Sequence, residues 1–122
     1  LGYGWLIVGF AMLCLQIVDI FPRALGIHAL TVGGIGMLTL GMMARVALGH
    51  TGRAIYAPKR LLNLCFTLTM AAAITRAIAP IIGINYRITI LSAQGLWTAA
   101  FGLFIVIYTP ILLSPRVDGK PD

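Results

Sequence analysis

The stretch HALTVGGIGMLTLGMMARVALGHTGR, from His28 to Arg53, is an apolar, glycine-rich segment with one histidine at its start. Between Ala24 and Leu48 the only charged residue is Arg45, which is typical of a membrane-spanning helix of roughly 20 or more residues. Glycine weakens a helix in water, but in lipid small residues let neighbouring backbones approach closely. The stretch therefore predicts a transmembrane helix packed inside a bundle, with its contacts made at Gly33, Gly34, Gly36 and Gly41.

The composition excludes an ordinary soluble domain. Hydrophobic residues make up 60% of the chain and charged residues only 10%, whereas charged residues are about 25% of a typical soluble domain. The net charge of +6 would suit nucleic acid, but the basic residues lie at the ends of the apolar segments instead of forming one face. The positive-inside rule explains such a distribution, so we expect the partner to be the lipid bilayer and not nucleic acid.

The apolar segments predict an all-α membrane protein, an antiparallel bundle of four transmembrane helices in a single domain over residues 1–122. The expected spans cover about 3–21, 24–48, 60–83 and 88–113, and residues 114–122 read as a polar, flexible tail. Basic residues are more frequent at one expected side, with Arg53, Lys59, Arg60, Arg116 and Lys120, than at the other, with Arg23 and Arg87. This excess predicts that both termini lie on the cytoplasmic side of the bacterial inner membrane.

Three motifs between His28 and Arg53 carry a family resemblance. HALTVG from His28 to Gly33, MARV from Met43 to Val46 and LGHTGR from Leu48 to Arg53 together resemble the signature of the NnrS family. These are polytopic bacterial membrane proteins linked to the nitric oxide response and reported to carry haem and copper. The resemblance therefore implies haem or copper as a cofactor. Because the family's chains are much longer, it also implies a C-terminal portion that packs against further transmembrane helices of the same or another chain.

The two histidines, His28 and His50, are the candidate metal ligands. A neutral imidazole binds both haem iron and copper. Along one helix the two residues are separated by roughly 33 Å, so they cannot ligate the same metal ion, and a second haem ligand must come from elsewhere. A packed histidine near a helix start and an interfacial histidine are the competing interpretations. Thioethers suit copper(I), but the mid-membrane methionines are equally well explained as gap fillers; they are Met12, Met37 and Met70.

The turn from Gly49 to Arg53, at the end of this stretch, is the candidate anion site. Gly49 and Gly52 flank His50 and Thr51, which predicts a tight turn with exposed backbone amides beside Arg53. Together with Arg45, one turn inside the helix, Arg53 is a candidate for binding the anionic group of a cofactor, such as a propionate, a phosphate or a lipid headgroup. A plain basic cytoplasmic loop that anchors the helix at the interface explains the same residues without a ligand.

One ion pair is expected between helices. Asp19 is the only acidic residue before Asp118 and falls inside the first expected span, where a carboxylate needs a partner. Arg76 lies several residues inside the third span, so we predict that Asp19 and Arg76 pair across the two helices. Arg23, one helical turn from Asp19, is the competing partner.

The remaining features leave the function open. Cys14 and Cys65 are expected to differ in depth by roughly 10 Å, too far for a disulfide, so both are predicted to be free thiols. No catalytic constellation is evident, and whether the chain catalyses a reaction is left open. Besides a metal-associated protein of the nitric oxide response, the pattern allows a transporter-like or channel domain with a polar pathway, or a structural accessory subunit of a respiratory complex.

Overall fold

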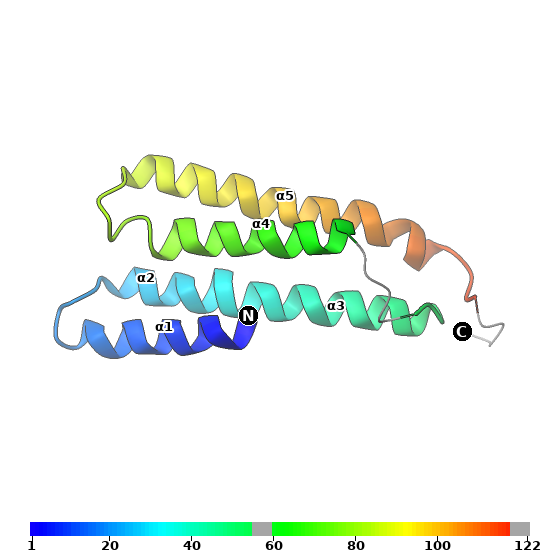
Figure 1. Ribbon diagram of the computed structural model, residues 1–122, viewed down its shortest axis with the longest axis horizontal. Helices are drawn as coiled ribbons and strands as arrows, with labels where there is room; N and C mark the ends of the chain where they lie inside the picture. Colours follow the sequence, from blue (N-terminus) through cyan, green and yellow to red (C-terminus); the bar gives the residue numbers. More distant parts are fainter. Residues whose placement is uncertain (55–59, 118–122) are drawn as a thin grey trace.

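The computed structural model describes residues 1–54 and 60–117, and all regular structure in them is helical. Two antiparallel hairpins lie side by side (Figure 1). The first joins α1 (Gly2–Gln16) to one continuous rod made of α2 (Arg23–His28), the π-helix η1 (Ala29–Ile35) and α3 (Gly36–His50). The second joins α4 (Arg60–Ala77) to α5 (Tyr86–Leu113). The all-helical, antiparallel architecture predicted from the sequence is confirmed.

Two of these rods are long and apolar enough to cross a membrane. They are Arg23–His50 and Tyr86–Leu113, each of 28 residues. At 1.5 Å per residue each is about 42 Å long, which exceeds the roughly 30 Å of a bilayer's hydrocarbon core. By the same arithmetic α1, with 15 residues, is only about 22 Å long.

The helices of the first and third expected spans end earlier than expected. The first was expected to reach residue 21, but α1 ends at Gln16 and Asp19 follows in the left-handed region, with a φ of 56°. The next helix starts after Pro22, which fixes an extended backbone at its N-cap. The third was expected to reach residue 83, but α4 ends at Ala77, before Pro80, which has no N–H to continue the helix.

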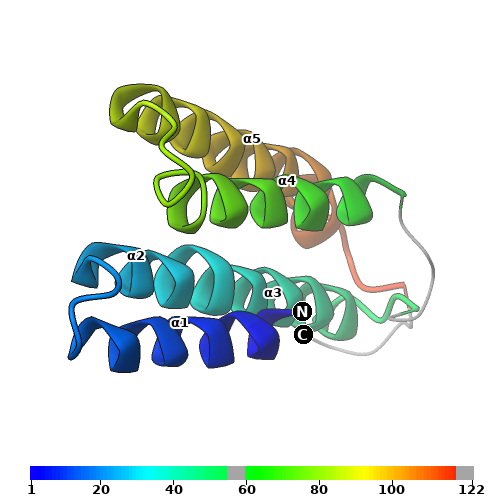
Figure 2. The same cartoon turned by 60° about the vertical axis from the view of Figure 1, so that its left-hand side comes forward.

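The rods are arranged as a row, which Figures 1 and 2 both show. The rod α2–η1–α3 lies in the middle, with α1 packed along one side of it and α4 along the other. The last helix, α5, packs mainly on α4 and also meets α3. The turn between α1 and α2 and the turn between α4 and α5 therefore lie at the same end of the molecule.

Glycines allow α1 to lie almost in backbone contact with the middle rod. A Cβ atom added at Gly33 would lie 2.5 Å from the Trp5 side chain, and one at Gly34 would lie 2.4 Å from Leu6. Such distances leave no room for a methyl group, so the packing depends on glycine. The π-helical turn falls on the same segment, where such bulges commonly accommodate a local packing demand. The prediction that this helix is packed inside a bundle is confirmed.

Trp5 connects three rods through this glycine contact. Its ring lies against Gly33, and its Nε1 donates to the sulfur of Met70 on α4 at 3.1 Å. Trp5 is only 6% exposed. Trp5 is therefore part of the core, whereas nearby Tyr3 is 74% exposed.

A second core fills the other half of the molecule, between α3, α4 and α5. Leu40, Cys65, Phe104 and Tyr108 are all buried there, and the rings of Phe104 and Tyr108 stack with their centroids 4.3 Å apart. Cys65 is buried and Cys14 is exposed, and neither forms a disulfide. The prediction of two free thiols is confirmed.

Candidate functional site

His28 lies at the end of α2, where the middle rod faces the second hairpin. The side chain is half-buried and lines a cavity of about 240 Å³. Across this cavity are Arg76 from α4, and Gln94 and Trp97 from α5. The predicted metal ligand therefore faces a cavity, and an arginine that the sequence assigned to a different partner lies in the same wall.

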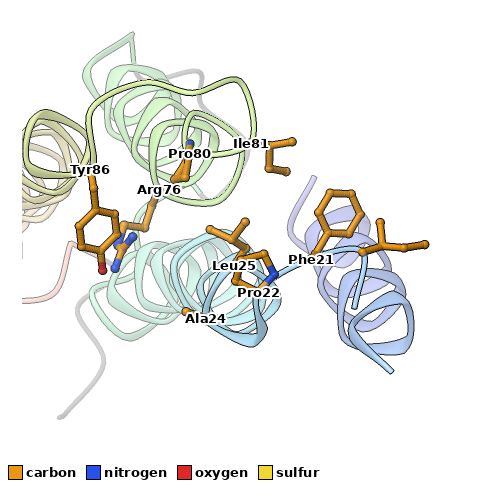
Figure 3. Close-up of a pocket in the computed structure, with 9 residues that line it drawn as sticks. Phe21, Pro22, Ala24, Leu25, Arg76, Pro80, Ile81 and Tyr86 are labelled. Carbon is orange, nitrogen blue, oxygen red and sulfur yellow. The ribbon is translucent and has the colours of Figure 1, made fainter. Parts of the chain in front are cut away.

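A larger cavity, of about 500 Å³, opens between the two turns at this end of the molecule. Figure 3 shows the guanidinium of Arg76 beside the ring of Tyr86, with Phe21 on the opposite side. The rest of the wall is mainly apolar and includes Leu25 and Ile81. Arg76 is the one charged residue among the described residues that line this cavity, and it is shared with the cavity at His28.

The contacts of Arg76 leave part of its charge unopposed. Its Cζ lies 5.5 Å from the centroid of the Tyr86 ring, within the distance of a cation–π contact. Its Nη1 is buried and has no hydrogen-bond partner within residues 1–54 and 60–117. A buried guanidinium nitrogen without an acceptor is costly, so this position is either strained or completed by a group outside the described chain.

Asp19 lies outside the helix in which it was expected. It is exposed in the turn after α1, because α1 ends three residues earlier, at Gln16. Within the described part of the chain no ion pair joins it to Arg76 or to Arg23, which is also exposed. The Asp19–Arg76 pair stays a prediction, and the contact that the structure gives Arg76 is Tyr86.

The turn around His50 is a helix stop. The amide of Arg53 donates to the Leu48 carbonyl at 2.9 Å, and that of Gly52 donates to the Gly49 carbonyl at 3.2 Å. Gly52 has a φ of 69°, so the two hydrogen bonds and the left-handed glycine form a Schellman motif. Thr51 adds a side-chain bond to the Ala47 carbonyl at 2.8 Å. The expectation of exposed amides at this turn is wrong, because the amides satisfy the helix's own carbonyls.

Arg53 connects the two hairpins at this end. Its Nη1 donates to the Ile111 carbonyl, in the last turn of α5, at 3.3 Å. A cation there is favourable because the last carbonyls of a helix have no partners within it. Nearby, the Val117 amide donates to the Thr51 carbonyl at 3.2 Å. The structure thus gives Arg53 a capping contact, while Lys59, which was counted on the same expected side, lies outside the described residues.

The other predicted site residues are not brought together. Arg45 and His50 are both exposed on α3, at the end of the molecule away from His28. No group of three histidine, cysteine, aspartate or glutamate side chains suited to a metal ion occurs in the described ranges. Met12, Met37 and Met70 all lie in or against the first hydrophobic core, where the Met70 sulfur accepts the hydrogen bond from Trp5.

Sequence reasoning missed the part that Tyr86 and Asn85 play at this end. The Asn85 side chain accepts hydrogen bonds from the amides of Arg87 at 3.0 Å and Ile88 at 3.4 Å, so it caps α5. An asparagine directly before an apolar run is the ordinary signal for such a cap. With this cap, α5 begins at Tyr86, and the Tyr86 ring lies next to Arg76. No local sequence pattern predicts that contact.

Comparison with known proteins identifies a family. A family model described as NnrS protein matches residues 1–116, nearly the whole chain. No curated protein and no solved structure matches the chain significantly.

Proposed function

Because the chain belongs to the NnrS family, we propose that it is a polytopic inner-membrane protein of the bacterial response to nitric oxide. The observation that carries the proposal is the family match over residues 1–116. It is supported by the two long apolar rods and by large apolar side chains that point outward, such as Ile7, Val106 and Leu113, at 71%, 70% and 81% exposure. Water would penalise so much outward apolar surface, whereas lipid accepts it.

The proposed topology has four spans, with both termini of this sequence on the cytoplasmic side. The two shorter helices, α1 and α4, belong to hairpins whose other arm is long enough to cross the bilayer. A short helix in such a hairpin spans by thinning the bilayer locally or by letting flanking residues complete the span. The basic residues Arg53, Arg60 and Arg116 lie on the proposed cytoplasmic side.

The described residues alone do not fit a complete haem or copper site. His28 supplies one imidazole, but the cavity beside it, about 240 Å³, is smaller than the roughly 300 Å³ at which pockets for organic ligands begin. His50 lies at the other end of the molecule, and no group of three histidine, cysteine, aspartate or glutamate side chains suited to copper occurs among the described residues. We therefore propose that His28 is one ligand of a shared haem or copper site. The other ligands would come from a second copy or from helices outside this chain.

An absorption spectrum of the purified protein tests this proposal. We expect a Soret band, or bound copper by elemental analysis, that is lost in His28→Ala and retained in His50→Ala. The matched pair separates the two candidate ligands because each substitution removes one imidazole from the same helical rod. A metal or haem content unchanged by His28→Ala contradicts the assignment of His28. No haem and no copper in the parent protein would favour a transporter-like domain or a structural subunit.

A further inference from the structure

The charge of Arg76 has no matching carboxylate within the described residues. The chain has three acidic residues, and the one that lies in the described ranges is Asp19, exposed in its turn. The Arg76 Nη1 is covered by protein and has no acceptor, and the aromatic ring of Tyr86 neutralises no charge. A covered guanidinium is stabilised most strongly by an anion that can bond it through two oxygens.

The space next to Arg76 suits a ligand with an apolar body. The larger cavity, about 500 Å³, lies within the range of roughly 300–1,000 Å³ typical of pockets for small organic molecules. Its walls carry Phe21, Leu25 and Ile81, and its polar groups are the Arg76 guanidinium and the Tyr86 hydroxyl (Figure 3). Apolar walls with a few convergent polar groups are the usual build of a site that orients one charged end of a ligand.

The Arg76 side chain can present its fork to this cavity. It is half-buried and lines the cavities on both sides, so it is reached from either of them while Nη1 remains covered. Rotation about its terminal torsions turns the covered nitrogen toward the open space. The planar fork of arginine matches carboxylate and phosphate oxygens in pairs, and the Tyr86 ring packs on the guanidinium.

We infer that Arg76 anchors a binding site for an oxyanion carried on an apolar body, which occupies the cavity between the two hairpin turns. The anion is a carboxylate or a phosphate ester. Its source is either a soluble organic acid or the headgroup of an anionic lipid, since both present this chemistry. The inference does not depend on haem or copper, and measurements on metal-free, haem-free protein keep it separate from the assignment of His28.

Calorimetric titration of the purified protein in neutral detergent tests the soluble source. The probes are 4-phenylbutyrate and its uncharged analogue 4-phenylbutanamide, which have the same apolar body. We expect saturable binding of the carboxylate and at least about tenfold weaker binding of the amide. Arg76→Gln should lose at least about tenfold in affinity for the carboxylate. The matched control Arg87→Gln, which removes an exposed cation near the same turn, should bind like the parent.

The lipid source is tested with mixed micelles that contain either phosphatidylglycerol or phosphatidylcholine. Phosphatidylglycerol that binds in an Arg76-dependent way, and displaces 4-phenylbutyrate, identifies the headgroup as the natural ligand. If Arg76→Gln does not fold, Arg76→Lys is tested instead. Lysine keeps the charge but lacks the planar fork, so this variant should bind the carboxylate several-fold more weakly than the parent does. Equal affinity of Arg76→Lys and the parent, or no Arg76-dependent binding of either probe, overturns the inference.

Discussion

Several residues that the sequence suggested for binding an anion have a structural role instead. The sequence Gly49-His50-Thr51-Gly52-Arg53 has the glycines and the basic group of an anion-binding turn, yet its amides close the end of α3 and Arg53 caps α5. Anion binding and helix capping need the same residue types, because a free backbone amide can donate its hydrogen bond either to an anion or to a carbonyl. What separates them is whether a carbonyl lies within reach, which only the folded chain reveals.

The pairing of Asp19 is testable at this scale by a double-mutant cycle. Asp19→Asn, Arg76→Gln and the double variant are compared by unfolding in detergent. Because Asp19 is exposed, we expect a coupling free energy below about 1 kcal/mol, the range of surface ion pairs. A buried pair would instead make each single variant cost about 3–5 kcal/mol and let the double variant recover part of it. The larger coupling would establish the pair predicted from the sequence.

At the scale of elements, the contact between α1 and the middle rod is set by glycine. The seam defined by Gly9, Gly26, Gly33 and Gly34 brings each of these backbones against a side chain of the other helix. The sequence predicted close packing of the Gly33 segment because glycine in an apolar span has few other uses. It did not predict the π-helix or the way in which Trp5 crosses Gly33 to reach Met70, because both depend on the register between two helices.

Gly33→Ala tests this seam. The added methyl group would lie 2.5 Å from the Trp5 ring, so the ring or the helix must shift and the contact with Met70 weakens. We expect a loss of about 1–3 kcal/mol in the free energy of unfolding, as for other overpacked sites. Gly95→Ala on α5 is the control, because an added Cβ meets nothing within 4 Å there. Equal stability of the two variants, measured by thermal unfolding in the same detergent, would show that the seam does not limit stability.

At the scale of the whole molecule, the sequence was sufficient for the helical class, the antiparallel order and the family. Apolar run lengths carry the helical class and the order of the helices locally, whereas the family came from the resemblance of the motifs between His28 and Arg53. The ends of the helices were harder to predict. The run from Ile17 to Phe21 is apolar except for Asp19, so hydropathy extends the first helix through it, yet the backbone turns at Asp19. The candidate site at Arg76 was not predicted, because it combines a helix end, a turn and a second hairpin that no sequence pattern connects.

Reporter fusions test the proposed topology of the whole chain. Fusions at Tyr56, which lies outside the described residues, and after the last residue should both report a cytoplasmic position, because basic residues are more frequent on that side. A fusion at Asn85, at the opposite end of the second hairpin, should report an external position. Reversed signals at Tyr56 and Asn85 would place Arg76 and its cavities at the cytoplasmic face instead.

The hydrogen bonds between the two hairpins are unevenly distributed along the molecule. Those from Arg53 to Ile111 and from Val117 to Thr51 lie at one end, and the bond from Trp5 to Met70 lies further along the rods. At the opposite end, residues 17–22 and 78–85 form no hydrogen bond to the described part of the other hairpin. Separating the two turns therefore breaks no hydrogen bond between the hairpins, whereas separating the opposite ends breaks those of Arg53 and Val117. The end that carries both cavities is the one at which packing alone holds the hairpins together.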